Sequence, residues 1–175
     1  GSGKSTLLRA VTLSILGQLD GTVLQQTSVR WANLLPVWVP FPFWTKMIES
    51  GAKSSLVDCL QRWFQEYGQA ELWHLVASAL RDERLLLVVD GLDEWTTEGA
   101  ARIGLERLQV FVEQVGAPVL LASRYYGIRR LSPQRHGWAV AKLASLTDEQ
   151  RQIVCQKFYL GKNGDSGANR ETETF

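Results

Sequence analysis

The sequence predicts an α/β fold in which a mainly parallel β-sheet is covered by helices on both faces, giving three layers. Two segments, 84–90 and 117–124, have the continuous hydrophobicity of strands that are buried on both faces, as central strands of parallel sheets are. Segments with apolar residues at helical spacing alternate with them, which is the order expected of β–α–β connections. The 175 residues correspond to about one domain.

The chain opens with a glycine-rich hexapeptide, GSGKST, followed by a segment with helical periodicity. Gly3, Lys4 and Ser5 match the end of the phosphate-binding loop G-x-x-x-x-G-K-[ST], whose first Gly would stand two places before Gly1. Gly17 is expected near the end of the following helix. The apolar positions predicted for that helix are Leu7, Leu8, Val11, Ile15 and Leu16.

Each residue type in the hexapeptide suits the binding of a nucleotide triphosphate. Glycines let successive backbone N–H groups point at phosphate oxygens, and the helix adds its positive N-terminal end. Lys4 would meet the β- and γ-phosphates, Ser5 would offer a hydroxyl to Mg²⁺, and Thr6 would hold the α-phosphate. The alternative is a Gly/Ser-rich linker before a helix. The predicted nucleotide-binding residues are Gly1, Ser2, Gly3, Lys4, Ser5 and Thr6.

The apolar run 84–90 ends in an acidic residue, within the sequence LLLVVDGLDEW. Because Mg²⁺ prefers oxygen ligands, Asp90 is the predicted metal ligand together with Ser5. Asp93 or Glu94 would orient or deprotonate an attacking water, a step that needs a carboxylate within hydrogen-bond reach. A strand that ends in a solvated acidic turn is the alternative interpretation.

A third polar position follows the segment 117–124, which ends in Ser123 and Arg124. In open α/β sheets ligands bind beyond the carboxyl ends of the strands, so Arg124 is expected near Asp90. There it would contact the γ-phosphate and stabilise the transferred group, which makes it a candidate catalytic residue with Asp93 and Glu94. The alternative is a surface Arg paired with an acid.

The remaining segments complete the predicted α/β alternation. Thr147 is expected to cap the last helix, with acidic residues in its first turn. The tail 161–175 has almost no apolar residues and is expected to be a linker or disordered. The predicted strands are 36–41 and 138–146, and the predicted helices are 54–67, 71–83, 100–115 and 147–160.

The composition is that of an ordinary globular domain, with 21% charged residues and a net charge of +1. This near balance favours neither nucleic acid nor an anionic membrane as a partner. No apolar run reaches the 18 residues of a membrane-spanning helix. Cys59 and Cys155 are expected to be reduced thiols in the core, as in a cytoplasmic protein.

Four segments together resemble the NACHT family, within the STAND class of signalling ATPases. GSGKST is similar to the end of the Walker A loop, and LLPVWVPFPFW to the second strand of the family. LLLVVDGLDEW is the sharpest match, because the Walker B segment of the family is a hydrophobic strand followed by D-G-x-D-E. VLLASRYYG resembles the sensor strand, and the likeness covers residues 1–160.

The resemblance implies a P-loop NTPase core that lacks its first strand, so these 175 residues alone are expected to bind nucleotide weakly or not at all. It also implies a slowly hydrolysing switch for ATP and ADP with Mg²⁺, in which exchange controls homo-oligomerisation. Effector and sensor domains of the same larger polypeptide would be its partners. Bacterial relatives of this type often act in antiphage defence.

Two other classes of function are compatible with the same motifs. A non-catalytic scaffold would bind nucleotide tightly without turnover. A metabolic P-loop kinase or a transport ATPase would also carry a phosphate loop, but the sequence shows no LSGGQ-type signature and no Arg-rich lid. These alternatives differ from the switch in turnover and in the need for an acceptor substrate.

Overall fold

A computed structural model of the chain describes residues 3–18, 31–52, 54–131, 138–153, 155 and 156. The predictions for Gly1, Ser2 and the tail 161–175 lie outside the described residues. The chain divides into two compact units, of which the first runs from Gly3 to Trp138 and the second begins at Ala139. The elements discussed below belong to the first unit unless stated otherwise.

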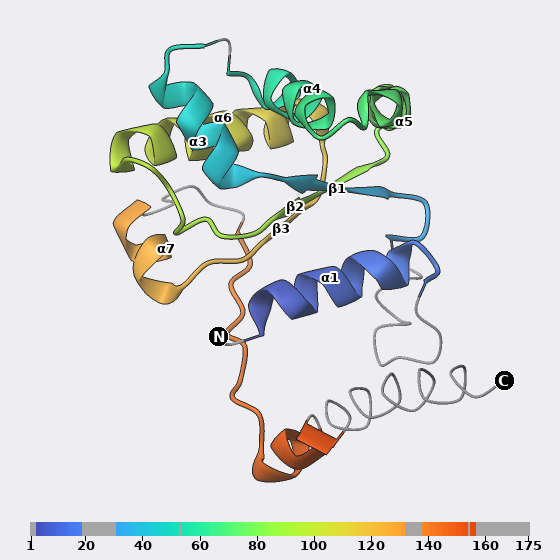
Figure 1. Ribbon diagram of the computed structural model, residues 1–175, viewed down its shortest axis with the longest axis vertical. Coiled ribbons are helices and arrows are strands. Elements are labelled where there is room, and N and C mark those ends of the chain that lie inside the picture. Colours follow the sequence, from blue (N-terminus) through green and yellow to red (C-terminus); the bar gives the residue numbers. More distant parts are fainter. Residues whose placement is uncertain (1–2, 19–30, 53, 132–137, 154, 157–175) are drawn as a thin grey trace, which may run out of the picture. The chain divides into compact units, whose positions relative to one another are not determined.

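The centre of the first unit is a three-stranded sheet in the order β1-β2-β3 (Figure 1). The strands are β1 (Leu35–Val39), β2 (Leu85–Val89) and β3 (Val119–Leu121). Both pairs of neighbours are parallel, with Val37 opposite Leu87 in the first pair. The predicted α/β class and the parallel sheet are therefore confirmed, and three of the four predicted strands occur near their expected positions.

Helices connect and cover the strands (Figure 1). Two helices begin with local capping signals. Ser55 and Asp58 form a capping box before the helix that starts at Leu56, and Thr97 accepts a backbone N–H before the helix that starts at Glu98. A short 3₁₀ turn, η1 (Ala70–Leu72), precedes α5. The helices are α1 (Lys4–Ile15), α3 (Phe41–Glu49), α4 (Leu56–Glu66), α5 (Trp73–Arg81), α6 (Glu98–Val115) and α7 (Tyr125–Leu131).

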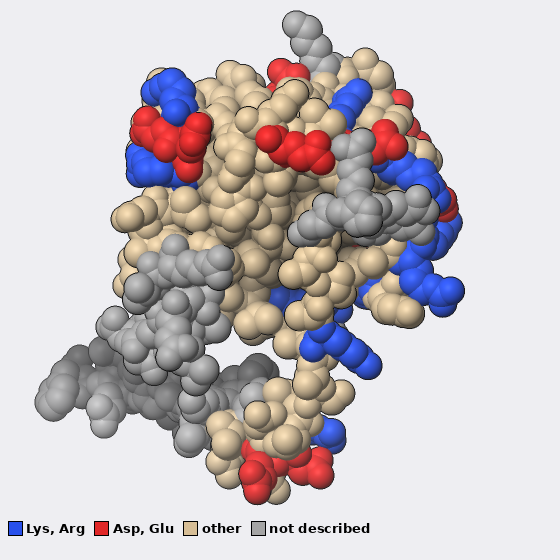
Figure 2. All heavy atoms as spheres, turned by 180° about the vertical axis from the view of Figure 1, so that it is seen from behind, with Lys and Arg blue, Asp and Glu red and all other residues tan. Residues whose placement is uncertain are grey.

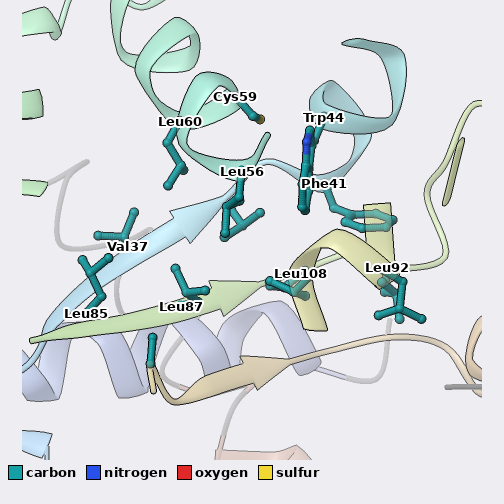
Figure 3. Packing of buried hydrophobic residues seen from close by; sticks show 14 of the residues in the cluster. Val37, Phe41, Trp44, Leu56, Cys59, Leu60, Leu85, Leu87, Leu92 and Leu108 are labelled. Carbon is teal, nitrogen blue, oxygen red and sulfur yellow. The ribbon is translucent and has the colours of Figure 1, made fainter. Parts of the chain in front are cut away.

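The larger hydrophobic core lies on one face of the sheet, beneath α3, α4, α5 and α6. Figure 3 shows Leu85 and Leu87 of β2 directed toward Leu56, Leu60 and residues of α3. Trp44 is fully buried there, and its indole N–H donates to the carbonyl of Ser54 at 2.8 Å. Its ring meets that of Phe41 edge-on, a favourable aromatic geometry.

A smaller core lies on the opposite face and is built by α1. Leu8, Val11 and Ile15 pack in a cluster with Leu86 and Val88, the alternate residues of β2. All five residues of β2 are buried, so this strand is covered on both faces as its sequence predicts. This packing fixes α1, which begins at Lys4 of the candidate phosphate loop, against the sheet.

The two edges of the sheet differ in their backbone chemistry. Leu35 donates its N–H to the carbonyl of Arg84, the residue before β2. Because the backbone groups of a strand alternate in direction, those of Pro36 and Trp38 point away from β2. A proline has no N–H to donate, and Pro36 therefore suits an edge strand. On the other side, Ala122 donates to Val89, which leaves the backbone groups of Val119 and Leu121 directed away from β2.

Several sequence predictions need correction. Residues 138–146, which were predicted to be a strand, form none; residues 139–146 are exposed, and no described strand pairs with them. A lone strand cannot satisfy its own backbone groups, which explains the difference. Leu7 and Leu16 are 41% and 48% exposed, because the stripe of α1 that faces the sheet is narrower than expected. The helices α3 and α7 were not predicted.

The predictions for the two cysteines and for the last helix are confirmed only in part. Cys59 is buried in the core, and burial raises the pKa of its thiol to about 12. Cys155 is exposed in the second unit, so its predicted burial is wrong. In the same unit residues 148–153 are helical, and Thr147 accepts the N–H of Gln150, which confirms the predicted cap.

Candidate functional site

The start of α1 lies at the edge of the sheet where the strands end (Figure 1). Gly3 precedes the helix with φ of 75°, a left-handed conformation that favours glycine. Glycine has no side chain with which to cap the helix, in contrast to Ser55 and Thr97 at the starts of two other helices. Lys4 and Ser5 of its first turn are partly buried and Thr6 is exposed. The N–H groups of a helix's first turn can bind anions.

The acidic turn that follows β2 places two carboxylates at the same strand end. Asp90 comes directly after the strand, and its Oδ1 accepts the N–H of Gly91 at 3.0 Å. Gly91 has φ of 70°, and a Cβ at this position would lie 3.0 Å from Oε2 of Glu94. The carboxylate of Glu94 therefore folds back over Gly91, and the left-handed backbone conformation favours glycine there.

A cavity of about 740 Å³ adjoins these two carboxylates. Asp90 and Glu94 form one side of it, Arg9 of α1 adds a positive charge, and aromatic rings form much of the rest. This combination of apolar walls with a few charged groups is typical of small-molecule sites. The lining residues are Arg9, Thr12, Leu13, Trp38, Val39, Pro40, Pro42, Phe43, Trp63, Asp90 and Glu94.

Asp93 has a different environment from Glu94, its neighbour in sequence. Its side chain is only 5% exposed and does not line the cavity. Oδ1 accepts the backbone N–H of Arg124 at 2.8 Å and the hydroxyl of Ser123 at 3.3 Å. Oδ2 lies 3.5 Å from Nε of Arg124. The carboxylate of Asp93 is thus occupied by the end of β3, whereas that of Glu94 faces the cavity.

Arg124 lies at the end of β3, beside the acidic turn, as the sequence predicts. Its side chain is 68% exposed and pairs with Asp93. This is the arrangement of the alternative interpretation, a surface Arg paired with an acid. The structure therefore brings Asp90 and Glu94 together at the cavity, and Asp93 together with Ser123 and Arg124 at the adjacent strand end.

The segment after the acidic turn also contacts the far end of α7. Arg130 donates to Glu98 at 2.7 Å, and its guanidinium lies 5.6 Å from the ring centroid of Trp95. Hydrogen bonds from Arg102, and then from Arg130, hold the pKa of the Glu98 carboxyl below its ordinary value. The segment from Asp93 to Glu98 thus contacts both ends of α7.

The donor set near the cavity bears on the predicted metal site. Among the described residues no three His, Cys, Asp or Glu side chains converge as a metal cluster. Asp90 lines the cavity, whereas Ser5 is not among its lining residues, and neither are Lys4, Thr6 and Arg124. A carboxylate and a hydroxyl are oxygen donors of the kind that suit Mg²⁺, which keeps several waters and takes phosphate oxygens as further ligands.

The surface carries no large block of one charge on the face shown in Figure 2, where acidic and basic side chains both occur. Such a mixture produces no broad field of one sign. Within the described part of the chain, no helix has the length and apolar character needed to cross a membrane.

Three aromatic residues and one glycine at this site were not predicted from the sequence. The aromatic wall of the cavity comes from Trp38, Phe43 and Trp63, which lie on three different elements, so no local pattern could join them. Gly127 is buried inside α7 against the acidic turn. A glycine within a helical segment is a recognisable signal of close packing, and this one was present in the sequence.

Comparison with known proteins identifies no relative: no protein-family model, no curated protein and no solved structure matches this chain. The functional assignment therefore depends on the chemistry and placement of the residues described above.

Proposed function

We propose that this chain is the nucleotide-binding core of an ATP-dependent switch of the NACHT type. The observation that carries the proposal is the acidic turn DGLDE at the end of the fully buried β2. Its Asp90 and Glu94 face a cavity beside α1, and its Asp93 contacts the adjacent strand end. A phosphate loop, a metal-binding acid and a basic strand end are the parts that phosphoryl-transfer sites of this class require.

The phosphates would bind at the beginning of α1. Its first turn follows Gly3 and contains Lys4 and Ser5. Helix starts of this kind favour anions through both their N–H groups and the helix dipole. Arg9 lines the cavity on the same helix and makes the approach more positive.

Ser5 and Asp90 would hold Mg²⁺, which neutralises charge on the phosphate oxygens when bound. Glu94 would accept a hydrogen bond from the attacking water, because its carboxylate lines the cavity while that of Asp93 is occupied. Arg124 would turn toward the γ-phosphate once nucleotide competes with Asp93 for its guanidinium. Slow hydrolysis would then reset the switch.

The open edge of β3 also supports this class of fold. Val119 and Leu121 direct their backbone groups away from β2, and neither is a proline. A further parallel strand can therefore pair there, which is where the strand expected before the phosphate loop would find hydrogen-bond partners. In the full-length protein β3 would then be an interior strand.

The test is equilibrium binding of Mg²⁺-ATP to the full-length protein, followed by measurement of phosphate release. We expect saturable binding of ATP and ADP with slow turnover. Lys4→Ala should weaken binding of both nucleotides, whereas Lys46→Ala, on the exposed end of α3, serves as a charge-matched control. Unchanged affinity in Lys4→Ala would contradict the proposed site.

A further inference from the structure

The geometry at the end of β3 assigns a role to Gly127, the last residue of the segment VLLASRYYG, to which the sequence alone gives no function. It is buried in α7, and a Cβ built on it would lie 2.4 Å from Cβ of Asp93 and 2.8 Å from the hydroxyl of Ser123. Both distances are shorter than Cβ contacts in folded proteins allow. Any side chain at position 127 would therefore push Asp93 or Ser123 out of place.

Backbone conformation does not explain the glycine at this position. Gly127 lies within the helix α7, and its φ is outside the left-handed region that only glycine adopts easily. Alanine would otherwise be preferred in a helix by roughly 1 kcal/mol. Space is the remaining reason, because the turn that carries Asp93 approaches the helix so closely that no Cβ fits.

The close approach coincides with the hydrogen bonds of Asp93. Its nearly buried carboxylate accepts the backbone N–H of Arg124 at 2.8 Å and lies 3.5 Å from the guanidinium of the same residue. The hydroxyl of Ser123 also reaches it. The guanidinium is 68% exposed and only weakly held, whereas the backbone N–H donates to a nearly buried carboxylate, so the backbone position of Arg124 depends on Asp93.

We propose that Asp93 and Gly127 form a positioning pair that fixes the backbone of Arg124 at the end of β3. Gly127 admits the Asp93 carboxylate to the strand end, and Asp93 then holds the backbone N–H of Arg124, while the exposed guanidinium stays able to turn toward a ligand. Asp93 is in this view a positioning residue and not the base that activates water. The relevance to γ-phosphate recognition rests on the proposed function, whereas the positioning itself does not.

The same segment holds α7 at its other end. Glu98 binds Arg130, whose guanidinium also lies over Trp95. Residues 93–98 therefore contact Arg124, which precedes α7, Gly127 in its first turn and Arg130 near its last turn.

The first arm of the test measures hydrogen exchange of the Arg124 amide by NMR in the absence of nucleotide. Asp93→Ala removes the acceptor and should accelerate exchange by roughly tenfold or more. Asp93→Asn keeps a carbonyl oxygen at the same place and should preserve most of the protection. Gly127→Ala should accelerate exchange as Asp93→Ala does, and the double variant should show little further change because both act on one contact.

Matched controls separate this effect from general destabilisation. Gly99→Ala adds a methyl group where nothing lies within 4 Å, and Asp82→Asn removes a carboxylate from an exposed pair with Arg84. Both should leave the Arg124 amide unchanged. If Gly127→Ala fails to fold, Asp93→Ala and Asp93→Asn still decide the role of Asp93. Arg124 exchange that stays at the wild-type rate in Asp93→Ala would overturn the proposal.

The second arm measures the ratio of ADP to ATP dissociation constants in the full-length protein. Asp93→Ala and Arg124→Ala should reduce this ratio equally, and their effects should not add. A reduced ratio in Arg124→Ala together with the wild-type ratio in Asp93→Ala would overturn the proposal. If the wild-type protein binds neither nucleotide, the proposed function fails, and the exchange experiment alone decides whether Asp93 and Gly127 hold Arg124.

Discussion

The burial of β2 on both faces is the feature on which both sides of the site depend, and paired substitutions can test it. Leu86 and Leu87 are each 0% exposed, although their side chains point to opposite faces of the sheet. Leu87 packs in the larger core, and Leu86 packs in the cluster that holds α1. In a sheet with one solvated face, only one of the two would be costly to truncate.

The expected magnitude follows from the atoms removed. Leu→Ala deletes three carbon groups, and at about 0.8 kcal/mol for each buried group this is a loss of about 2.4 kcal/mol. The cavity left behind raises the cost to about 3–4 kcal/mol. With a urea m-value of about 2 kcal/mol/M, each variant should unfold at a midpoint about 1.5–2 M lower than the wild type.

The assay is equilibrium urea unfolding followed by tryptophan fluorescence and far-UV circular dichroism. Leu7→Ala is the matched control, since Leu7 is 41% exposed on α1 and its truncation should cost less than about 0.5 kcal/mol. Equal destabilisation by Leu86→Ala and Leu87→Ala would support two covered faces. A cost for Leu86→Ala as small as that for Leu7→Ala would refute the packing of α1 on the sheet.

Three further predictions concern the site and its surroundings. Glu94→Gln should lower ATP hydrolysis by roughly 100-fold or more with little change in nucleotide affinity, as measured by phosphate release; undiminished turnover would exclude Glu94 as the base. Burial raises the pKa of Cys59 from 9.0 to about 12, so the unfolded chain loses this proton first. The free energy of unfolding should therefore fall by about 1.4 kcal/mol per pH unit from pH 9 toward 12, a slope that should be absent in Cys59→Ala. The pKa of Glu98 is lowered, so its pairs with Arg102 and Arg130 add fully to the free energy of unfolding at pH values above the ordinary pKa of the carboxyl. This contribution is lost as the pH falls through the lowered pKa. Amide chemical shifts of α7 should follow that titration in the wild type and not in Glu98→Gln.

Much of the fold could be predicted because its signals are local. The apolar run of β2 and the capping residue Thr147 depend on neighbours in sequence, and both were identified. The helix α3 was missed because Pro40 and Pro42 resemble strand-ending signals, although proline also suits the first turn of a helix. Segment 138–146 was predicted to be a strand from its apolar residues, but a local sequence pattern does not show whether a partner strand exists.

The site was predictable in its motifs and not in its contacts. The segment DGLDE identified the acids, but the sequence left open whether Asp93 or Glu94 would face a ligand. The environments of Asp93 and Glu94 differ because the end of β3 lies beside Asp93. Asp93 binds Arg124, which is thirty-one residues away in the sequence. The role of Gly127 likewise depends on its contact with Asp93, which no sequence periodicity predicts.

The most direct test of the central claim is the affinity of the full-length protein for Mg²⁺-ATP, measured by isothermal titration calorimetry in the wild type and in Lys4→Ala. We expect one binding site per chain in the wild type. In Lys4→Ala the affinity should be weaker by roughly 100-fold or more, because removing the cation leaves phosphate charge unpaired. Equal affinity in the two proteins, or no binding by a folded wild type, would contradict it.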